Sequence, residues 1–243
     1  MARDFILCIK TTRAKDRDAR SEHMIEIVPT VVPENAEDIV HVADRYRTFA
    51  HTIHVDVADG VFAPNTTWMP EEGYVFPSGV NFEIHLMVAD PHTVGVAYAR
   101  AGAFSIIGHA EAFKTAGRAG EAFSDWRKSG VKSVQTAALL QTPLESVAPY
   151  VSISDFILLM TIGSIGVQGI PFEESGIDRV RSFKDMHPEA MIAVDGGVSE
   201  KNIERLAQSG AIHFCVGSAI SKAIDYSVVY QRLANLASRG YNP

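Results

Sequence analysis

Four side chains that can bind a metal ion lie near the ends of three apolar runs. His54 and Asp56 are two residues apart in HTIHVDV, His85 lies in NFEIHLMV, and Asp195 follows MIAV and precedes two glycines. Residues i and i+2 of a strand point to the same side, so His54 and Asp56 share one face while the apolar residues between them point to the other. For any one of them alone, a structural hydrogen-bonding role is the commoner explanation.

The four together favour a bound cation. Carboxylates held close to one another repel, and each ionisable group removed from water is costly to keep charged. A divalent ion offsets both effects. Mixed imidazole and carboxylate ligation suits zinc, iron, manganese or cobalt, whereas magnesium and calcium prefer all-oxygen sites. The pattern therefore predicts one divalent transition metal per chain.

The elements that would position these residues alternate regularly. The expected strands are residues 25–32, 51–57, 81–88, 103–110, 131–139, 155–162, 190–198 and 212–218. Helical patterns follow most of them, including residues 34–49, 199–210 and 221–240. Repeated strand–helix units predict an α/β fold with a parallel sheet covered by helices. Eight units, and no GxGxxG after the first strand, favour a closed (β/α)8 TIM barrel, whose active site lies where the strands end.

Two stretches fall outside this alternation. Residues 70–79, PEEGYVFPSG, stand where the second helix is due, but two prolines and two glycines predict a short or irregular segment. Residues 1–24 precede the first strand and are expected to be an N-terminal extension of unknown role: a plug for the barrel bottom, an oligomer contact or a disordered tail. Residues 25–243 would then form a single barrel domain.

Composition excludes several classes of partner. The net charge of −7 and a pI of about 5.7 give no positive field for nucleic acid. Cys8 and Cys215, the only cysteines, form neither a disulfide framework nor a CxxC site, and we expect both to be reduced. No apolar run reaches the ~18 residues of a membrane span, and the N-terminus lacks a cleavage signal. We therefore expect a cytoplasmic protein with no membrane partner.

Four segments carry a resemblance to a known family. HVDVADGVFAPN (54–65), EIHLMV (83–88), LLMT (158–161) and VDGGV (194–198) resemble the ribulose-phosphate 3-epimerase family in order and spacing, from about residue 25 to about 220. The resemblance implies a TIM barrel of the ribulose-phosphate-binding type and a metal-dependent isomerase of carbohydrate metabolism. It also implies a sugar phosphate as the small-molecule partner and a homo-oligomer.

The implied reaction inverts C3, the carbon next to the ketone, of a ketose phosphate: ribulose 5-phosphate to xylulose 5-phosphate, or a close analogue. The family's metal ligands match His54, Asp56, His85 and Asp195. Inversion needs a base on one face, an acid on the other, and stabilisation of the enediolate oxygens between them. Asp56 and Asp195 are the expected catalytic residues, and the ion is the expected Lewis acid. Glu83 either orients a ligand imidazole or belongs to a polar layer inside the barrel.

Some expected substrate contacts also come from the resemblance. Met87 and Met160 match family methionines near the enediolate, although filling the core is an equally good explanation. Thr30 stands where the family has a serine, and Ala58 where it has a methionine, which leaves a larger space above the metal. The family's loop of the form PGFGGQ is GSIGVQG (163–169) here, with Gly166 as its candidate contact.

A phosphate cradle is expected after the last two strands. Gly196, Gly197, Gly217 and Ser218 stand where barrels of this kind bind phosphate through backbone N–H groups. The alternative is that these glycines only permit tight turns.

Two other functions compete with the epimerase. A related barrel lyase or synthase, such as a metal-free decarboxylase, would be expected to place a lysine among the acids of the second strand, and DVADG has none. A non-catalytic sugar-phosphate-binding barrel would have no need to retain both aspartates.

Overall fold

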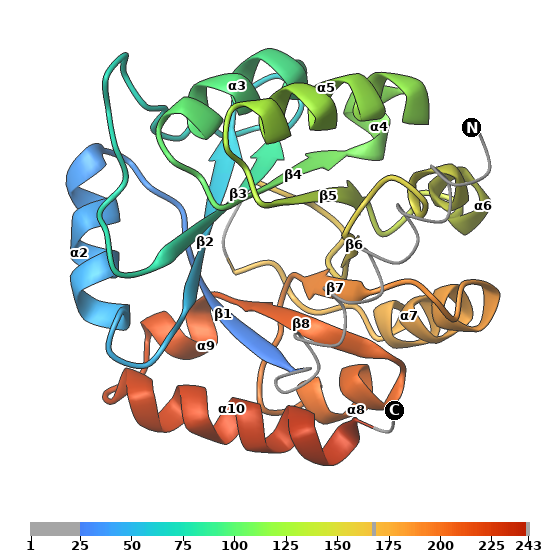
Figure 1. Ribbon diagram of the computed structural model, residues 1–243. Helices are drawn as coiled ribbons and strands as arrows, with labels where there is room; N and C mark the ends of the chain where they lie inside the picture. Colours follow the sequence, from blue (N-terminus) through green and yellow to red (C-terminus); the bar gives the residue numbers. More distant parts are fainter. Residues whose placement is uncertain (1–24, 167–168, 242–243) are drawn as a thin grey trace, which may run out of the picture.

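The described part of the protein is an eight-stranded parallel barrel. The structure is a computed structural model that describes residues 25–166 and 169–241. Each strand pairs with the next, and β8 returns to β1 to close the sheet (Figure 1). The strands are β1 (Glu26–Val31), β2 (Thr52–Ala58), β3 (Asn81–Met87), β4 (Ser105–His109), β5 (Ser133–Ala138), β6 (Phe156–Met160), β7 (Ile192–Asp195) and β8 (Ala211–Val216). The expected TIM barrel is confirmed.

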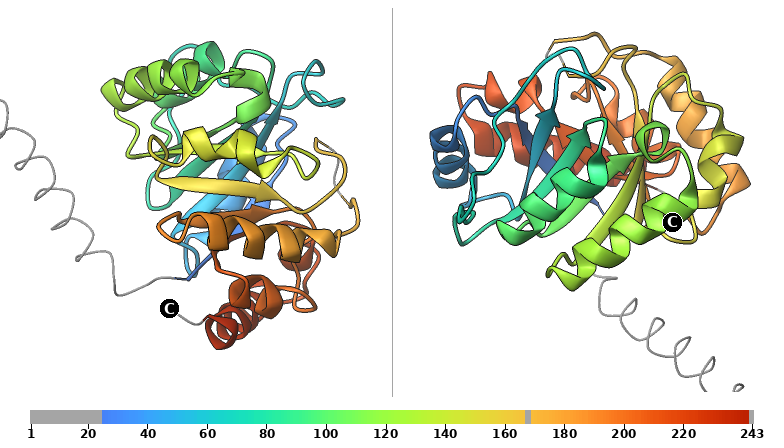
Figure 2. Two further views of the ribbon diagram at one scale, coloured as in Figure 1. Left: turned by 90° about the vertical axis from the view of Figure 1, so that its right-hand side faces the viewer. Right: turned by 90° about the horizontal axis from the view of Figure 1, so that it is seen from above.

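Helices surround the strands. They are α2 (Ala36–Tyr46), α3 (Pro91–Arg100), α4 (Ala110–Phe113), α5 (Ala116–Lys128), α6 (Leu144–Val147), the 3-10 helix η1 (Ala148–Tyr150), α7 (Ser175–Met186), α8 (Ile203–Gln208), α9 (Ser218–Ser221) and α10 (Tyr226–Gly240). Figure 2 shows α3 and α5 on one side of the strands and α10 on the other.

Two helices differ from the expected ranges. The helix expected over 199–210 begins only at Ile203, because the Asn202 side chain accepts the Ser199 N–H (2.8 Å) and donates to the Gly197 carbonyl (3.0 Å). The stretch 221–240 is not one helix, since α10 begins at Tyr226 after the Asp225 side chain caps it at the Val228 N–H. Side-chain hydrogen bonds, in the turn before α8 and at the cap of α10, accompany both starts, and periodicity does not show them.

The alternation of side chains along each strand divides the core in two. On β2, Ile53, Val55 and Val57 belong to the larger cluster between sheet and helices. Met87, Met160 and Cys215 belong to a smaller cluster inside the barrel. The inward and outward faces expected from the two-residue period are confirmed.

Between β2 and β3 the chain forms a loop where the other units have a helix. Residues 70–79 are irregular, as their prolines and glycines predict. Within this loop Phe76 is buried, stacks on Phe82 of β3 at 4.5 Å between ring centroids, and donates its backbone N–H to Ala101. A buried aromatic ring thus covers the outside of β3 in place of a helix.

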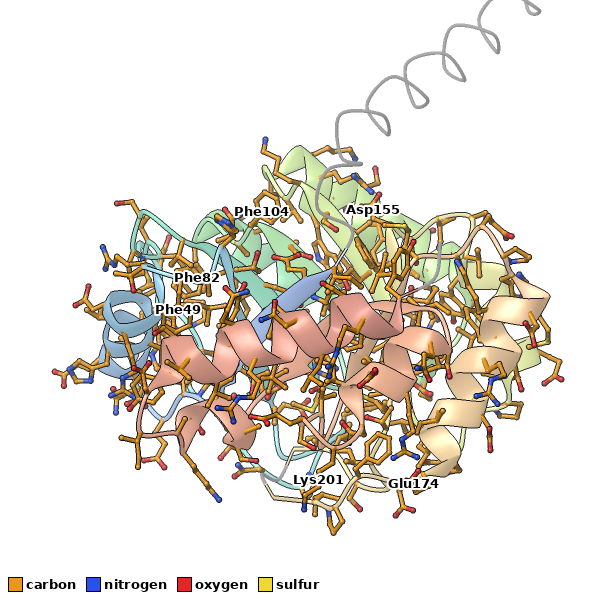
Figure 3. The ribbon with its side chains drawn as sticks, turned by 90° about the horizontal axis from the view of Figure 1, so that it is seen from below. Phe49, Phe82, Phe104, Asp155, Glu174 and Lys201 are labelled. Atoms are coloured by element: carbon orange, nitrogen blue, oxygen red, sulfur yellow. The ribbon has the colours of Figure 1, made fainter. Side chains whose placement is uncertain are left out.

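The two ends of the barrel are distinct. Phe104 and Asp155 directly precede β4 and β6, whereas Glu174 and Lys201 follow β6 and β7, and Figure 3 shows the two pairs at opposite edges of the molecule. The sequence-predicted site belongs to the second end. Among the described residues, no helix combines the length and the apolarity that crossing a membrane requires. Residues 1–24, with Cys8, lie outside the described residues, while Cys215 is a buried free thiol.

Candidate metal centre and substrate cavity

The register of three strands brings the four predicted ligands together. Parallel pairing sets Asp56 of β2 beside His85 of β3, and closure of the barrel brings Asp195 of β7 to the same mouth. His85 Nδ1 lies 3.2 Å from Asp56 Oδ1 and 3.5 Å from Asp195 Oδ2. His54 Nε2 lies 3.4 Å from the same Asp56 oxygen. One possible ligand atom from each of the four residues lies within 4.8 Å of all the others.

An orphaned nitrogen makes this group fit a metal ion. His54 is fully buried, and its Nε2 has no hydrogen-bond partner among the described residues although it faces the cluster. Its other nitrogen, Nδ1, is 2.8 Å from Glu83 Oε1. A buried polar atom without a partner needs an explanation. A metal ion that accepts the Nε2 lone pair is one explanation. The imidazoles and carboxylates around this nitrogen are also suitable ligands for such an ion.

The electrostatics of the cluster indicate a need for positive charge. Burial alone would raise the pKa of Asp56, but its close contacts with His54 (3.4 Å) and His85 (3.2 Å) and their charge outweigh it and hold that pKa well below its usual range. Burial also tends to lower the pKa of His85, yet its bonds to Asp195 and Asp56 raise it. The carboxylates therefore favour positive charge at this place. A divalent cation bound there would supply that charge, with its imidazole ligands neutral.

Glu83 orients one of the imidazoles and also belongs to a polar layer inside the barrel. Besides His54 Nδ1, its carboxylate is 3.0 Å from His213 Nε2 and accepts a bond of 2.5 Å from the Gln135 amide. Burial would raise the pKa of Glu83, but the charge and hydrogen bonds of His213 and His54 hold it well below its usual range. Because Glu83 is ionised, it favours a proton on His54 Nδ1 and leaves Nε2 for a ligand bond.

Three inward-facing residues were missed from the sequence. His109, at the end of β4, is buried with Nε2 2.9 Å from His85 Nε2. His213 and Cys215 lie on β8, and the Cys215 sulfur is 3.3 Å from His54 Nδ1. The same two-residue alternation that places His54 and Asp56 could have found them, since His109 follows the inward-facing Ile107 by two positions.

A cavity opens above the cluster. It is lined by all eight residues expected to contact substrate: Thr30, Met87, Met160, Gly166, Gly196, Gly197, Gly217 and Ser218. Asp56 and Asp195 reach its floor, while the imidazoles of His54 and His85 are fully buried. The carboxylates are therefore the polar groups of the cluster that a bound molecule meets first.

Packing explains some of the glycines of this cavity without a ligand. Gly197 has a φ of 66°, and a Cβ there would lie 2.9 Å from the Phe172 backbone. At Gly217 a Cβ would lie 2.8 Å from Thr30 Oγ1. Both positions thus exclude a side chain for steric reasons. A phosphate role for them has to rest on their place in the cavity wall.

Comparison with known sequences points to one family. A family model described as the ribulose-phosphate 3 epimerase family matches residues 26–221. A ribulose-phosphate 3-epimerase of Mycobacterium bovis is 34% identical over 209 residues, which cover 82% of this chain and 87% of that protein. A ribulose-phosphate 3-epimerase of Bacillus subtilis is 29% identical over 205 residues, covering 81% of this chain and 92% of the relative.

Solved structures share the barrel. The 3-hexulose-6-phosphate synthase of Salmonella typhimurium superposes with a TM-score of 0.66 at 15% identity, covering 89% of this chain and 100% of that one. The orotidine 5'-phosphate decarboxylase of Pyrococcus horikoshii gives 0.58 at 16% identity, covering 87% and 99%. At these identities the likeness shows the fold alone.

Proposed function

The chain belongs to the ribulose-phosphate 3-epimerase family, and on that premise we propose that it is a metal-dependent isomerase that inverts C3 of a ketose phosphate. The reaction is ribulose 5-phosphate to xylulose 5-phosphate or a close analogue. The observation that carries the proposal is the convergence of two imidazoles and two carboxylates at the floor of one cavity, at the carboxyl ends of β2, β3 and β7.

His54, Asp56, His85 and Asp195 would hold one divalent transition metal ion: zinc, iron, manganese or cobalt. His54 would bind through Nε2, since Glu83 occupies its other nitrogen. His85 would bind through Nδ1, the nitrogen that faces both aspartates. When bound, the ion supplies a Lewis acid that stabilises negative charge on two substrate oxygens.

The two aspartates are suited to move the proton. They lie on β2 and β7, which β1 and β8 separate in the closed sheet, so they reach the substrate from different sides. Their side chains expose 15% and 13% of their surface at the cavity floor. One carboxylate takes the proton as the C3–H bond breaks, and the other delivers a proton to the opposite face. The direction of the reaction decides which of them acts first.

The rest of the cavity would hold the sugar phosphate. We place the phosphate at the backbone N–H groups near Gly197 and Ser218, with Gly196 and Gly217 beside them. The carbon chain would then cross the metal, flanked by Met87 and Met160. Ala58 and the departures of the sequence 163–169 from the family's loop predict a different flank, so among these substrates we expect the close analogue, a ketose other than ribulose 5-phosphate, or tolerance of several.

Solvent exchange at C3 tests the proposal. Deuterium incorporation from heavy water into the ketose phosphate is followed in the metal-loaded enzyme by NMR. Asp56→Asn and Asp195→Asn should each slow exchange by about 10² to 10⁴, because each face needs its own acid or base. Asp178→Asn, an exposed carboxylate on α7, serves as the matched control. Exchange at the wild-type rate in either cluster variant would refute the assignment.

The lyase or synthase alternative gains no specific support. The β2 segment and the loop that follows it, DVADG, contain no lysine among the acids. The likeness to the synthase and the decarboxylase extends to the fold alone. A homo-oligomeric state and a cytoplasmic location stay predictions.

A further inference from the structure

Two further side chains, His109 and Glu111, extend a hydrogen-bonded row from His85. The row begins at His85 Nε2, the ring nitrogen on the far side from the aspartates. His109 ends β4, is fully buried, and places Nε2 at 2.9 Å from His85 Nε2. The two rings are 5.0 Å apart between centroids and inclined by 21°. His109 Nδ1 in turn lies 3.3 Å from Glu111 Oε2. His85, His109 and Glu111 thus form a continuous hydrogen-bonded row.

We propose that His109 and Glu111 are positioning residues that fix the tautomer and ring orientation of His85, so that Nδ1 is the nitrogen presented to the metal. The inference rests on the proposed function, because it concerns how one of the four ligands is held. Neither residue reaches the substrate cavity. Their effect would pass entirely through the His85 imidazole.

The number of donors on each group determines which way the hydrogen bonds of the row run. A neutral imidazole carries one N–H and one lone pair, and an ionised carboxylate only accepts. Glu111 therefore accepts a hydrogen bond from the N–H of His109 Nδ1, which leaves His109 Nε2 as an acceptor. With the metal bound, His85 would then donate from Nε2 and keep its lone pair on Nδ1, the nitrogen that faces Asp56 and Asp195. One carboxylate at the end of the row decides which nitrogen of His85 is free to bind.

Glu111 is itself held in place. Its Oε1 accepts the Leu139 backbone N–H at 3.0 Å and also a short bond from the Thr142 hydroxyl, both in the segment that follows β5. Burial would raise the pKa of Glu111, but bonds from His109, Thr142 and the Leu139 N–H lower it to about 2. The carboxylate is ionised at neutral pH. The segment after β5, a strand that supplies no predicted metal ligand, therefore holds the row that positions the ligand His85.

Metal affinity measures this role separately from turnover. Zinc or cobalt affinity of the full chain is determined by competition with a chelator, and thermal unfolding checks that each variant is folded. His109→Phe keeps a ring against Phe62, which lies 5.0 Å away, but removes the acceptor, and should weaken binding by about 10- to 100-fold. His109→Gln retains an acceptor for the His85 N–H and should recover most of the affinity.

Glu111→Gln tests the far end of the row. Its amide can donate to His109 Nδ1, which would allow the other tautomer and turn an N–H of His109 toward the N–H of His85, so binding should weaken here too. His92→Gln is the matched control, since His92 forms the same kind of pair with Asp125 (3.0 Å) on the surface. Wild-type affinity in both His109→Phe and Glu111→Gln would overturn this inference alone, whereas no metal binding by the wild type would overturn the proposed function as well.

The tautomers can also be observed directly. Nitrogen-15 NMR of the zinc-loaded wild-type chain should show His109 protonated on Nδ1 only and His85 protonated on Nε2. These signals do not depend on a variant that folds. His109 protonated on Nε2 would overturn the proposed row even if all variants lost metal.

Discussion

The two walls of the cavity are built differently. On the ligand wall, the side chains of β2, β3 and β7 are fixed by hydrogen bonds, as when Glu83 holds His54. On the loop wall, after β6, Ile162 and Ile165 contribute apolar side chains, and Gly166 packs against Ala63. The strands thus hold reactive groups at defined distances, while the loop shapes the space beside them.

The boundary between the two walls lies at Thr161. Its hydroxyl is 2.5 Å from the Gly196 carbonyl oxygen and 3.0 Å from that of Asp195, so the end of β6 is tied to the strand that carries a ligand. One residue later, Ile162 fills the space that a Cβ on Gly196 would need. A change in the loop beyond this point can alter substrate choice while the cluster stays in place.

The largest effect should come from removing an imidazole from the ligand wall. His54→Ala and His85→Ala should each strip the metal, because each removes one of the four protein ligands and leaves the coordination incomplete. Elemental analysis of the purified protein gives metal per chain. His41→Ala, an exposed histidine on α2, should keep full occupancy. A full metal content in both His54→Ala and His85→Ala would refute the metal assignment. It would also contradict the proposed difference between the two walls.

A smaller effect should separate phosphorylated from free sugars. Charge-assisted hydrogen bonds to a phosphate contribute about 1.5–3 kcal/mol each, so kcat/KM should be roughly 10- to 100-fold higher or more for a phosphorylated ketose than for the free sugar. A panel of pentulose and hexulose phosphates and their free sugars, followed for inversion next to the ketone, measures it. Equal turnover of the two kinds would contradict the phosphate position near Gly197 and Ser218.

The smallest effect should come from the flank of the cavity. Ala58 is buried beside Met87 in the β2–β3 pairing, and Ala58→Met would restore the side chain expected from the family resemblance. Filling that space should shift relative kcat/KM toward ribulose 5-phosphate by roughly tenfold, with metal content unchanged. A wild-type enzyme already strict for ribulose 5-phosphate would show that the loop wall has not changed its selectivity.

Local periodicity was sufficient to predict the barrel and to propose much of the candidate site. The two-residue alternation of a strand is a property of the chain itself, so HTIHVDV alone shows that His54 and Asp56 share a face. The count of strand–helix units indicates closure, and the prolines of 70–79 indicate a missing helix. These inferences needed no contact between distant residues.

Only the tertiary structure decided which atoms meet. The register of β3 with β4 brings His109 to His85, and the loop after β5 brings Leu139 and Thr142 to Glu111. The start of α8 likewise depended on how the Asn202 side chain folds back on its turn. Such pairings follow from strand register and side-chain geometry across the closed sheet, which no pattern confined to one segment contains.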